Sequence, residues 1–287
     1  MYWQTSRFLI ALDRPRVMGI VNLTPDSFSD AGQYARPQAG IAHCQRLVEE
    51  GADILDLGGE SSRPGAAILT VDEEWARVSP VLAGAVNLGV PISIDTCKPE
   101  VMRRALEEGA DIINDIHALE RPGALEVLAA NASAGVCLMH MRGEPQTMQT
   151  LTAYADVVAE VAAYLRSRAE AAQAAGIAAC RLVLDPGYGF AKNSPQNLEL
   201  LARQAELLRL DQPLLVGWSR KRTLGDLTGR PAHERLAASI AAALAAVDRG
   251  AAIVRVHDVA ATVDALKVWV AINGRERQSP DLKEQES

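Results

Sequence analysis

The chain of 287 residues has few cysteines and few aromatic residues, and both shortages exclude classes of protein. Its four cysteines (Cys44, Cys97, Cys137 and Cys180) are scattered, with no Cys-x-x-Cys pair and no histidine at zinc-ligand spacing. A zinc site or a disulfide framework is therefore not expected, and we predict that the cysteines are small buried hydrophobic residues. Aromatic residues make up 4% of the chain against 48% for all hydrophobic residues, which predicts an aliphatic core.

Long apolar runs and an excess of positive charge are also missing. No run approaches the ~20 apolar residues that cross a bilayer, and the apolar segment FLIAL at residues 8–12 is too short for a secretion signal. The net charge is −7 and the isoelectric point is near 5.3, which argues against general nucleic-acid binding. We therefore expect a cytoplasmic protein whose partners are neither membranes nor nucleic acids.

The sequence does contain a regular alternation of apolar, strand-like runs with helical segments. Most of the helical segments end in a glycine just before the next run. Glycine is common at the position directly after a helix, so these glycines mark the expected helix ends. Strict alternation of strand and helix predicts a parallel sheet, and eight such units in about 250 residues match a closed (β/α)8 TIM barrel. The eight runs cover 16–24, 52–60, 90–96, 110–116, 135–141, 181–187, 213–219 and 251–258.

An open, doubly wound sheet is the alternative architecture for the same alternation. That fold favours a glycine-rich phosphate loop after its first strand, and the segment NLTPDSFSDAG at 22–32 contains no such loop. We therefore expect a single α/β barrel domain over residues 1–274. The remaining residues, 275–287, are polar and lack periodicity, which predicts a disordered tail.

Polar residues follow each of the eight predicted strands. In a barrel the carboxyl ends of parallel strands meet at one mouth, where the chemistry of such enzymes is done. One such residue could simply cap the next helix, but a ring of them at corresponding positions indicates a site. The ring consists of Asn22, Glu60, Ser61, Ser62, Arg63, Asp95, Asn114, His140, Asp185, Ser219, Lys221, Arg255 and His257.

One half of this ring offers hydrogen-bond acceptors. Asp95, Asn114 and Asp185 present two carboxylates and an amide, with Lys221 as a compensating cation. Two carboxylates in an enclosed mouth need donors, and a flat heterocycle with a guanidine-like N–H edge supplies two parallel ones, as arginine does. This half predicts a ring-shaped ligand.

The other half of the ring is suited to an anion. It contains Arg63 and His257 together with Asn22, whose neutral oxygen suits a magnesium ion that keeps most of its waters. In the last run, AAIVRVHDVA at 251–260, alternation places Arg255 on the same face as His257, opposite the valines. If the valines pack against helices, the Arg255 guanidinium points into the barrel and requires an anionic partner.

Eight segments of the chain resemble, in order, the signature segments of the bacterial dihydropteroate synthase family. They are GIVNLTPDSFSDAG, DLGGESSRPGA, SIDTCKPEV, NDI, LMHM, LDPGYGFAK, GWSRK and RVHDV, and the resemblance extends from about residue 16 to residue 270. The family is a (β/α)8 barrel and usually a homodimer. With magnesium it joins p-aminobenzoate to 6-hydroxymethyl-7,8-dihydropterin diphosphate, which gives 7,8-dihydropteroate and diphosphate, and sulfonamides compete with p-aminobenzoate.

The resemblance implies a role for each matching residue of this chain. It places Phe28 and Pro64, on two loops expected to be mobile, against p-aminobenzoate, and it makes diphosphate the anion that Arg255 binds. The implied pterin pocket is Asp95, Asn114, Met139, Asp185, Phe190, Gly217, Lys221 and Arg255. The implied p-aminobenzoate site and its loops are Phe28, Ser61, Ser62, Arg63, Pro64, Lys221 and Arg222. The implied diphosphate site is Asn22, Ser62, Arg63, Arg255 and His257, with magnesium on Asn22, and the implied catalytic residues are Asn22, Arg63, Lys221, Arg255 and His257.

Two positions depart from the family pattern. Ser62 replaces the usual threonine, and Arg222 stands where serine is common. Two other functions also stay open: a corrinoid-linked methyltransferase, which has no diphosphate to bind, and a non-catalytic relative that binds pterin without turnover. The basic residues of the ring favour the synthase over the methyltransferase, and they are Arg63, Lys221, Arg255 and His257.

Overall fold

The computed structural model describes residues 1–24, 36–61 and 67–273. Four residues expected in the site (Phe28, Ser62, Arg63 and Pro64) lie outside the described residues. So does the tail at 275–287 for which we expected disorder. The domain boundary expected at residue 274 falls where the described part ends, and it stays a prediction.

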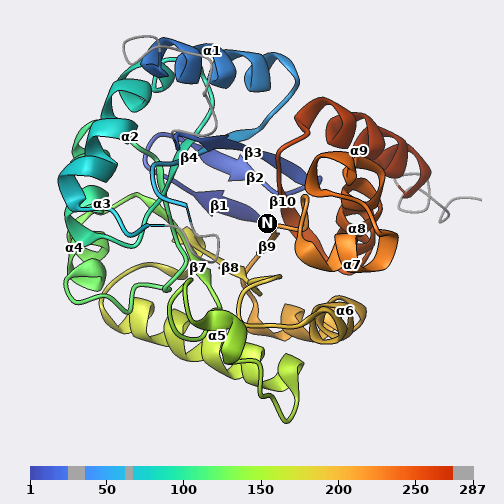
Figure 1. Cartoon of the computed structure of the whole chain (residues 1–287). Helices are drawn as coiled ribbons and strands as arrows, with labels where there is room; N and C mark the ends of the chain where they lie inside the picture. Colours follow the sequence, from blue (N-terminus) through green and yellow to red (C-terminus); the bar gives the residue numbers. More distant parts are fainter. Residues whose placement is uncertain (25–35, 62–66, 274–287) are drawn as a thin grey trace, which may run out of the picture.

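Eight parallel strands close into a barrel in the order β10-β3-β4-β5-β6-β7-β8-β9. Figure 1 looks into this barrel and shows the helices arranged around it. The predicted (β/α)8 fold is confirmed, and the open doubly wound alternative is wrong. The strands are β3 (Arg16–Asn22), β4 (Ile54–Gly58), β5 (Ile92–Asp95), β6 (Ile112–Asp115), β7 (Gly135–Met139), β8 (Leu182–Asp185), β9 (Leu214–Val216) and β10 (Ala251–Val256).

The helices between the strands begin and end at recognisable sequence signals. At the start of α2, Thr70 and Glu73 cap each other's backbone N–H groups. At the ends of α3 and α8, Gly109 and Gly250 have φ of +96° and +89°, which glycine adopts readily. The helices are α1 (Arg36–Glu49), α2 (Val71–Ala85), α3 (Pro99–Glu107), α4 (Ala124–Ala130), α5 (Val157–Ala174), α6 (Ser194–Ala202), α7 (Arg222–Thr228), α8 (Leu236–Asp248) and α9 (Val259–Asn273).

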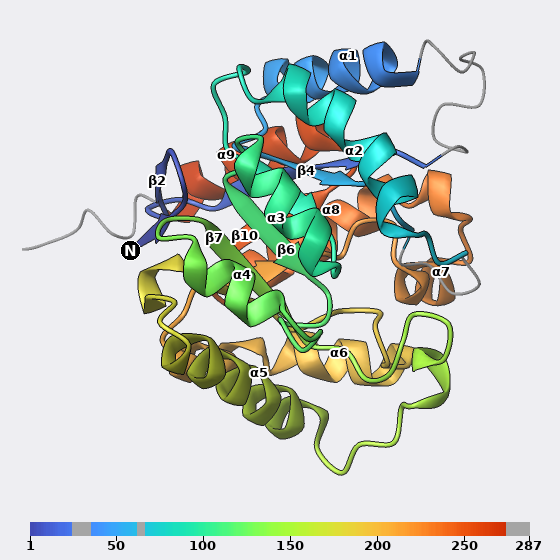
Figure 2. The ribbon, with the colours of Figure 1, turned by 90° about the vertical axis from the view of Figure 1, so that its left-hand side faces the viewer.

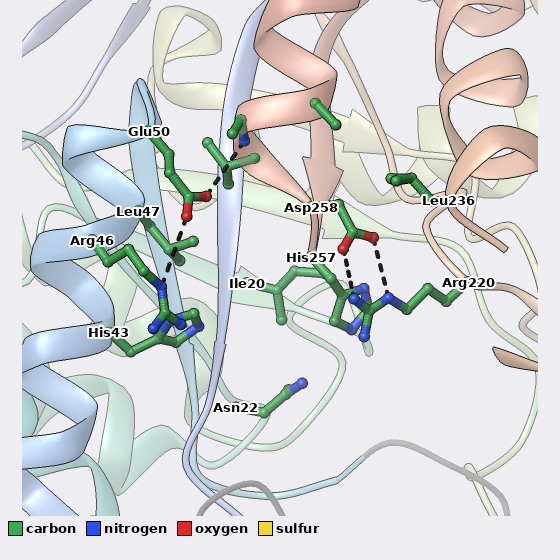
Figure 3. Close-up of a pocket in the computed structure, with 13 residues that line it drawn as sticks. Ile20, Asn22, His43, Arg46, Leu47, Glu50, Arg220, Leu236, His257 and Asp258 are labelled. Atoms are coloured by element: carbon green, nitrogen blue, oxygen red, sulfur yellow. Dashed lines mark hydrogen bonds and ion pairs between the residues drawn. The ribbon is translucent and has the colours of Figure 1, made fainter. Parts of the chain in front are cut away.

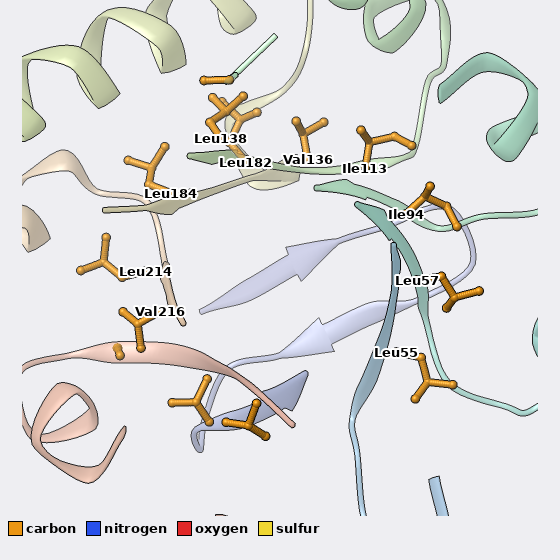
Figure 4. Packing of buried hydrophobic residues seen from close by; sticks show 14 of the residues in the cluster. Leu55, Leu57, Ile94, Ile113, Val136, Leu138, Leu182, Leu184, Leu214 and Val216 are labelled. Atoms are coloured by element: carbon orange, nitrogen blue, oxygen red, sulfur yellow. The ribbon is translucent and has the colours of Figure 1, made fainter. Parts of the chain in front are cut away.

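The strands read as unbroken apolar runs because both of their faces are covered. Alternate side chains point outward and pack against the helices, as Leu55, Leu57, Ile94 and Val216 do in Figure 4. The side chains between them point into the barrel and form an apolar floor. This floor consists of Met18, Ile54, Ile112, Cys137, Val183, Leu215 and Ile253.

An antiparallel hairpin, β1 (Tyr2–Gln4) with β2 (Leu9–Ala11), precedes the barrel and was not predicted. Its Trp3 is completely buried against the apolar floor, and the indole Nε1 donates to the carbonyl of Arg181 at 2.8 Å. Figure 2 shows the hairpin at one end of the barrel, opposite α7. The amino end of the barrel is therefore closed, which leaves the carboxyl ends of the strands for a site.

All four cysteines are free. Cys44 and Cys137 are buried, as predicted, whereas Cys97 is half-buried and Cys180 is exposed. Within the described residues, we find no helix with the length and apolarity needed to span a membrane.

Candidate active site

The strand register brings several predicted site residues to one level of the barrel. Across β3, β4, β5 and β6, Asn22 lies beside Gly58, Gly58 beside Asp95, and Asp95 beside Asn114. On the far side, Met139 of β7 lies beside Asp185 of β8. Asn22, Asn114, Met139 and Asp185 have the same alternation as the floor residues of their own strands, and Asp95 has that of Ser93, which pairs with Ile112 of the floor. Their side chains therefore point into the barrel above the floor.

Arg255 extends across the barrel from β10 and binds two carboxylates. Its Nε donates to Oδ2 of Asp56 at 2.6 Å, and its Nη2 donates to Oδ2 of Asp95 at 2.8 Å. Burial alone would lower the pKa of Arg255, but the two carboxylates raise it above its usual value. The inward direction of Arg255 is as predicted. The expected anionic partners are present and belong to the protein itself, and the role of Arg255 toward diphosphate stays a prediction.

Asp56 is the site residue that sequence reasoning missed. It is completely buried in the middle of β4, one layer below Asp95. Its Oδ2 also accepts from Nδ2 of Asn114 at 3.1 Å, while its buried Oδ1 has no hydrogen-bond partner among the described residues. The available signal was a lone carboxylate in the run ILDLGG, at the same alternation as Ile54 and Gly58.

Burial shifts the pKa values of three charged groups in the mouth. It raises the pKa of Asp95 to about 7. The negative charges of neighbouring carboxylates, above all Asp56, also raise this pKa, and together with burial they outweigh the lowering effect of Arg255. Burial also raises the pKa of Asp185, although the hydrogen bond from the Gly187 N–H group and the positive charge of Lys221 act to lower it. It lowers the pKa of Lys221 to about 8, although Asp185 opposes this shift. Perturbed groups of both signs that share one mouth are typical of a functional site.

A tight segment after β8 positions Asp185 and brings an aromatic ring to Lys221. The Gly187 N–H group donates to Oδ1 of Asp185 at 2.7 Å. Gly187 has φ of +68°, and a Cβ there would lie 1.9 Å from the carbonyl oxygen of His140, so only glycine fits. The ring centroid of Phe190 then lies 4.1 Å from Nζ of Lys221, in a cation–π contact.

His140 does not join the ring of polar residues in the mouth. It directly follows Met139, whose side chain points inward, so the His140 side chain points outward. Its Nδ1 lies 2.9 Å from Nζ of Lys192, and its ring packs edge-on against Tyr164. Burial lowers the pKa of His140 to about 2, so the imidazole is neutral. Lys192 also donates to the carbonyls at 187 and 190 at 3.0 Å each, which holds that segment in place.

Asn22 and His257 line a cavity of about 530 Å³ next to the mouth, between α1 and the start of α9. Figure 3 shows both side chains on its walls, together with His43 and Arg220. Nδ1 of His257 lies 2.9 Å from Oγ of Ser219. The structure therefore brings Asn22 and His257 together, beside the mouth that contains the acceptor groups.

The remaining predicted residues divide between the mouth and the surface. Gly217 lies at the end of β9, where a Cβ would meet only the Cβ of Arg255 at 4.0 Å, and Ser61 is half-buried after β4. Arg222 begins α7 with a side chain that is 86% exposed, and its Nε is 3.9 Å from Oδ1 of Asp226. Arg222 is therefore exposed to solvent directly after Lys221, and its expected role stays a prediction.

Comparisons with known proteins agree on one family. The profile of the pterin binding enzymes matches residues 18–257. The chain is 56% identical to a dihydropteroate synthase of Neisseria meningitidis serogroup B over 276 residues, which cover 94% of this chain and 97% of that protein. It is 50% identical to the dihydropteroate synthase of Escherichia coli K12 over 258 residues, which cover 90% of this chain and 91% of that protein.

Solved structures agree with this result. The Burkholderia cenocepacia dihydropteroate synthase complexed with 7,8-dihydropteroate has a TM-score of 0.89 and 49% identity, over 97% of this chain and 98% of that chain. The Yersinia pestis dihydropteroate synthase in complex with a sulfonamide drug has a TM-score of 0.90 and 43% identity, over 96% of this chain and 100% of that chain.

Proposed function

The chain belongs to the pterin binding enzymes, and we propose that within this family it is a dihydropteroate synthase. It joins p-aminobenzoate to 6-hydroxymethyl-7,8-dihydropterin diphosphate, and the products are 7,8-dihydropteroate and diphosphate. The observation that carries this proposal is the set of acceptors Asp95, Asn114 and Asp185 at one mouth of the barrel. Their carboxylates and amide match the N–H edge of a pterin ring.

The pterin replaces part of the contacts of Arg255. In the structure, Nη2 of Arg255 binds Asp95 while Nε binds the deeper Asp56. We assign the N–H edge of the pterin to Asp95 and Asp185, so the ring displaces Nη2 from Asp95 while Asp56 keeps the guanidinium beside the ring. Lys221 and Phe190 close the opposite side of the pocket, with Met139 and Gly217 beside it.

The reaction needs no nucleophilic side chain. The bond between the pterin methylene and the diphosphate oxygen breaks, and the electron-rich ring stabilises the resulting cation. The aniline nitrogen of p-aminobenzoate then forms the new C–N bond and loses a proton. Because an aryl amine is a weak nucleophile, this dissociative order is favoured. Arg255, His257 and Asn22 stabilise the charge on the departing oxygen, so catalysis is electrostatic and positional.

Magnesium fits this site as an ion that diphosphate brings with it. The described residues contain no cluster of three or more histidine, cysteine or acidic side chains that could hold a metal alone. Asn22 offers one neutral oxygen, and magnesium in proteins commonly binds few protein ligands together with substrate phosphates. The ion supplies positive charge to the leaving group when bound.

The p-aminobenzoate side of the site depends partly on residues outside the described ranges. We assign Lys221 and Ser61 to its border, and Phe28, Ser62, Arg63 and Pro64 keep their expected roles as proposals. The exposed Arg222 also keeps its expected role at this side of the site as a proposal. We propose that sulfonamides compete with p-aminobenzoate here, and that the chain acts as a cytoplasmic homodimer.

Product analysis tests this function. The purified protein is incubated with the pterin diphosphate, p-aminobenzoate and magnesium, and 7,8-dihydropteroate is quantified by mass spectrometry. We expect turnover that requires both substrates and falls when a sulfonamide is added. Pterin binding without product would identify the non-catalytic relative, and methyl transfer from a methylated folate to a corrinoid would identify the methyltransferase.

A further inference from the structure

We propose that Arg220 is a positioning residue for the diphosphate side of the site. Its ion pair with Asp258 holds the turn after β9 against the turn after β10, and this contact keeps His257 in place. The proposal rests on the proposed function, because it concerns the residues assigned to diphosphate. Neither Arg220 nor Asp258 belongs to the predicted substrate contacts.

The first observation is the backbone of Arg220. Its φ is +59°, in the left-handed region, which is unfavourable for a non-glycine residue. Such a conformation persists when its surroundings hold it there, and this is common at functional sites. Here the Arg220 N–H group donates to Oγ of Ser239 at 3.0 Å, and its carbonyl accepts from Nη1 of Arg235 at 3.1 Å.

The second observation is that the Asp258 carboxylate binds the Arg220 guanidinium through both of its oxygens. Nη2 of Arg220 donates to Oδ1 at 2.6 Å and Nε donates to Oδ2 at 3.2 Å, so both oxygens face the guanidinium (Figure 3). Asp258 directly precedes α9, where a carboxylate ordinarily caps the first N–H groups of the helix. In this chain Glu50, which directly follows α1, accepts from the N–H group of Ala260 instead, at 3.4 Å. The Asp258 carboxylate thus binds Arg220, while the backbone carbonyl of Asp258 accepts from Thr262 of α9.

The third observation is a parallel link between the same two turns. Ser219 precedes Arg220 and His257 precedes Asp258, and Oγ of Ser219 lies 2.9 Å from Nδ1 of His257. The backbone N–H group of His257 also donates to that Oγ at 3.2 Å. Two adjacent pairs of residues therefore connect the turns. Loss of the Arg220–Asp258 pair removes one of these two connections, the one directly next to His257.

Lys221 has support of its own, although it directly follows Arg220. Its N–H group donates to the carbonyl of Trp218 at 3.2 Å, and its carbonyl accepts from Nη1 of Arg235 at 3.3 Å. Loss of the ion pair should therefore disturb the diphosphate side more than the pterin side. A general loss of stability would weaken both sides equally.

Two probes separate these outcomes in calorimetric titrations: magnesium diphosphate, and 6-hydroxymethyl-7,8-dihydropterin, which carries no diphosphate. For Arg220→Ala we expect about tenfold weaker binding of magnesium diphosphate, equivalent to one charged hydrogen bond, and less than twofold weaker binding of the pterin. Arg220→Lys should restore part of the loss. The matched control is Arg230→Ala, because the Arg230 side chain forms an exposed pair with Glu234 and, within the described residues, has no ion pair with a residue assigned to a substrate.

Two further variants separate the ion pair from the backbone conformation. Arg220→Gly accepts the positive φ without strain but lacks the guanidinium, so we expect it to bind magnesium diphosphate as weakly as Arg220→Ala. Asp258→Asn should cause a similar loss, and the double variant should lose little more than either single variant.

Equal weakening of both probes by Arg220→Ala would overturn the proposal, as would wild-type affinity in Arg220→Gly or additive losses in the double variant. Product formation by the wild-type protein tests the proposed function separately. If the wild-type protein binds neither probe, the proposed function is contradicted and the positioning role falls with it.

Discussion

Replacement of Asp56 by asparagine tests how the barrel keeps an arginine in its interior. Asp56 is completely buried, and its Oδ2 accepts from both Arg255 at 2.6 Å and Asn114 at 3.1 Å. Asparagine keeps the shape and one acceptor but removes the charge. Arg255 then has a single carboxylate partner, Asp95.

The expected loss in the free energy of unfolding is about 2 kcal/mol. Removal of one partner from a buried ion pair costs roughly 3–5 kcal/mol. Here Arg255 retains Asp95, and its side chain is 21% exposed, so solvent compensates for part of that loss. Burial of the Asp56 charge is itself unfavourable, because Oδ1 has no hydrogen-bond partner among the described residues. The variant removes this charge, which reduces the loss further.

The same variant should bind the pterin diphosphate about tenfold more weakly, the effect of one charged hydrogen bond. In the variant, Arg255 must leave its only remaining carboxylate when the pterin takes Asp95. Urea denaturation measures the stability, and titration with the pterin diphosphate measures the affinity. Asp264→Asn is the control, because Asp264 is 76% exposed in a surface pair with Lys267, and such pairs contribute at most about 1 kcal/mol. Wild-type stability and affinity in Asp56→Asn would refute this account of the interior ion pair.

Three other changes have defined outcomes. Asp185→Asn should fold and bind the pterin roughly ten- to a hundredfold more weakly, since an amide group places a donor where an acceptor is needed; unchanged calorimetry would exclude Asp185 from the site. Gly187→Ala should lower the urea midpoint sharply and reduce turnover, because its Cβ would lie 1.9 Å from the carbonyl oxygen of His140; a wild-type midpoint would contradict that geometry. Pterin affinity should decline as the pH falls through about 7, where Asp95 gains a proton, and as it rises through about 8, where Lys221 loses one. An affinity independent of pH between 6 and 9 would show that neither charge contributes.

The sequence was sufficient to predict the barrel because its alternating runs are long and regular. Every one of the eight predicted strands is present, with ends that are shorter by a few residues. The hairpin at the amino end was not predicted, because its strands are three residues each and their role depends on a distant contact between Trp3 and the carbonyl of Arg181. Such a contact leaves no local pattern.

The sequence predicted the site residues at the carboxyl ends of the strands, but it did not predict Asp56, which lies one layer deeper in the barrel. Polar residues at strand ends are visible in the sequence, but Asp56 lies inside an apolar run and was read as part of it. His140 was expected in the mouth although it follows Met139, and two adjacent residues on a strand cannot both point inward. Arg255 pairs with Asp56 and Asp95 because its guanidinium reaches the depths at which their side chains lie in the barrel. Alternation along one strand shows which side chains point inward but not how deep they lie.

A crystal structure of the protein with the pterin diphosphate and magnesium tests the central claim most directly. We expect the N–H edge of the ring within hydrogen-bond distance of Asp95 and Asp185, with Arg255 Nη2 displaced from Asp95 and the diphosphate facing Asn22 and His257. A ring bound elsewhere, with the Arg255–Asp95 pair intact, would contradict the assignment of this mouth as the pterin site.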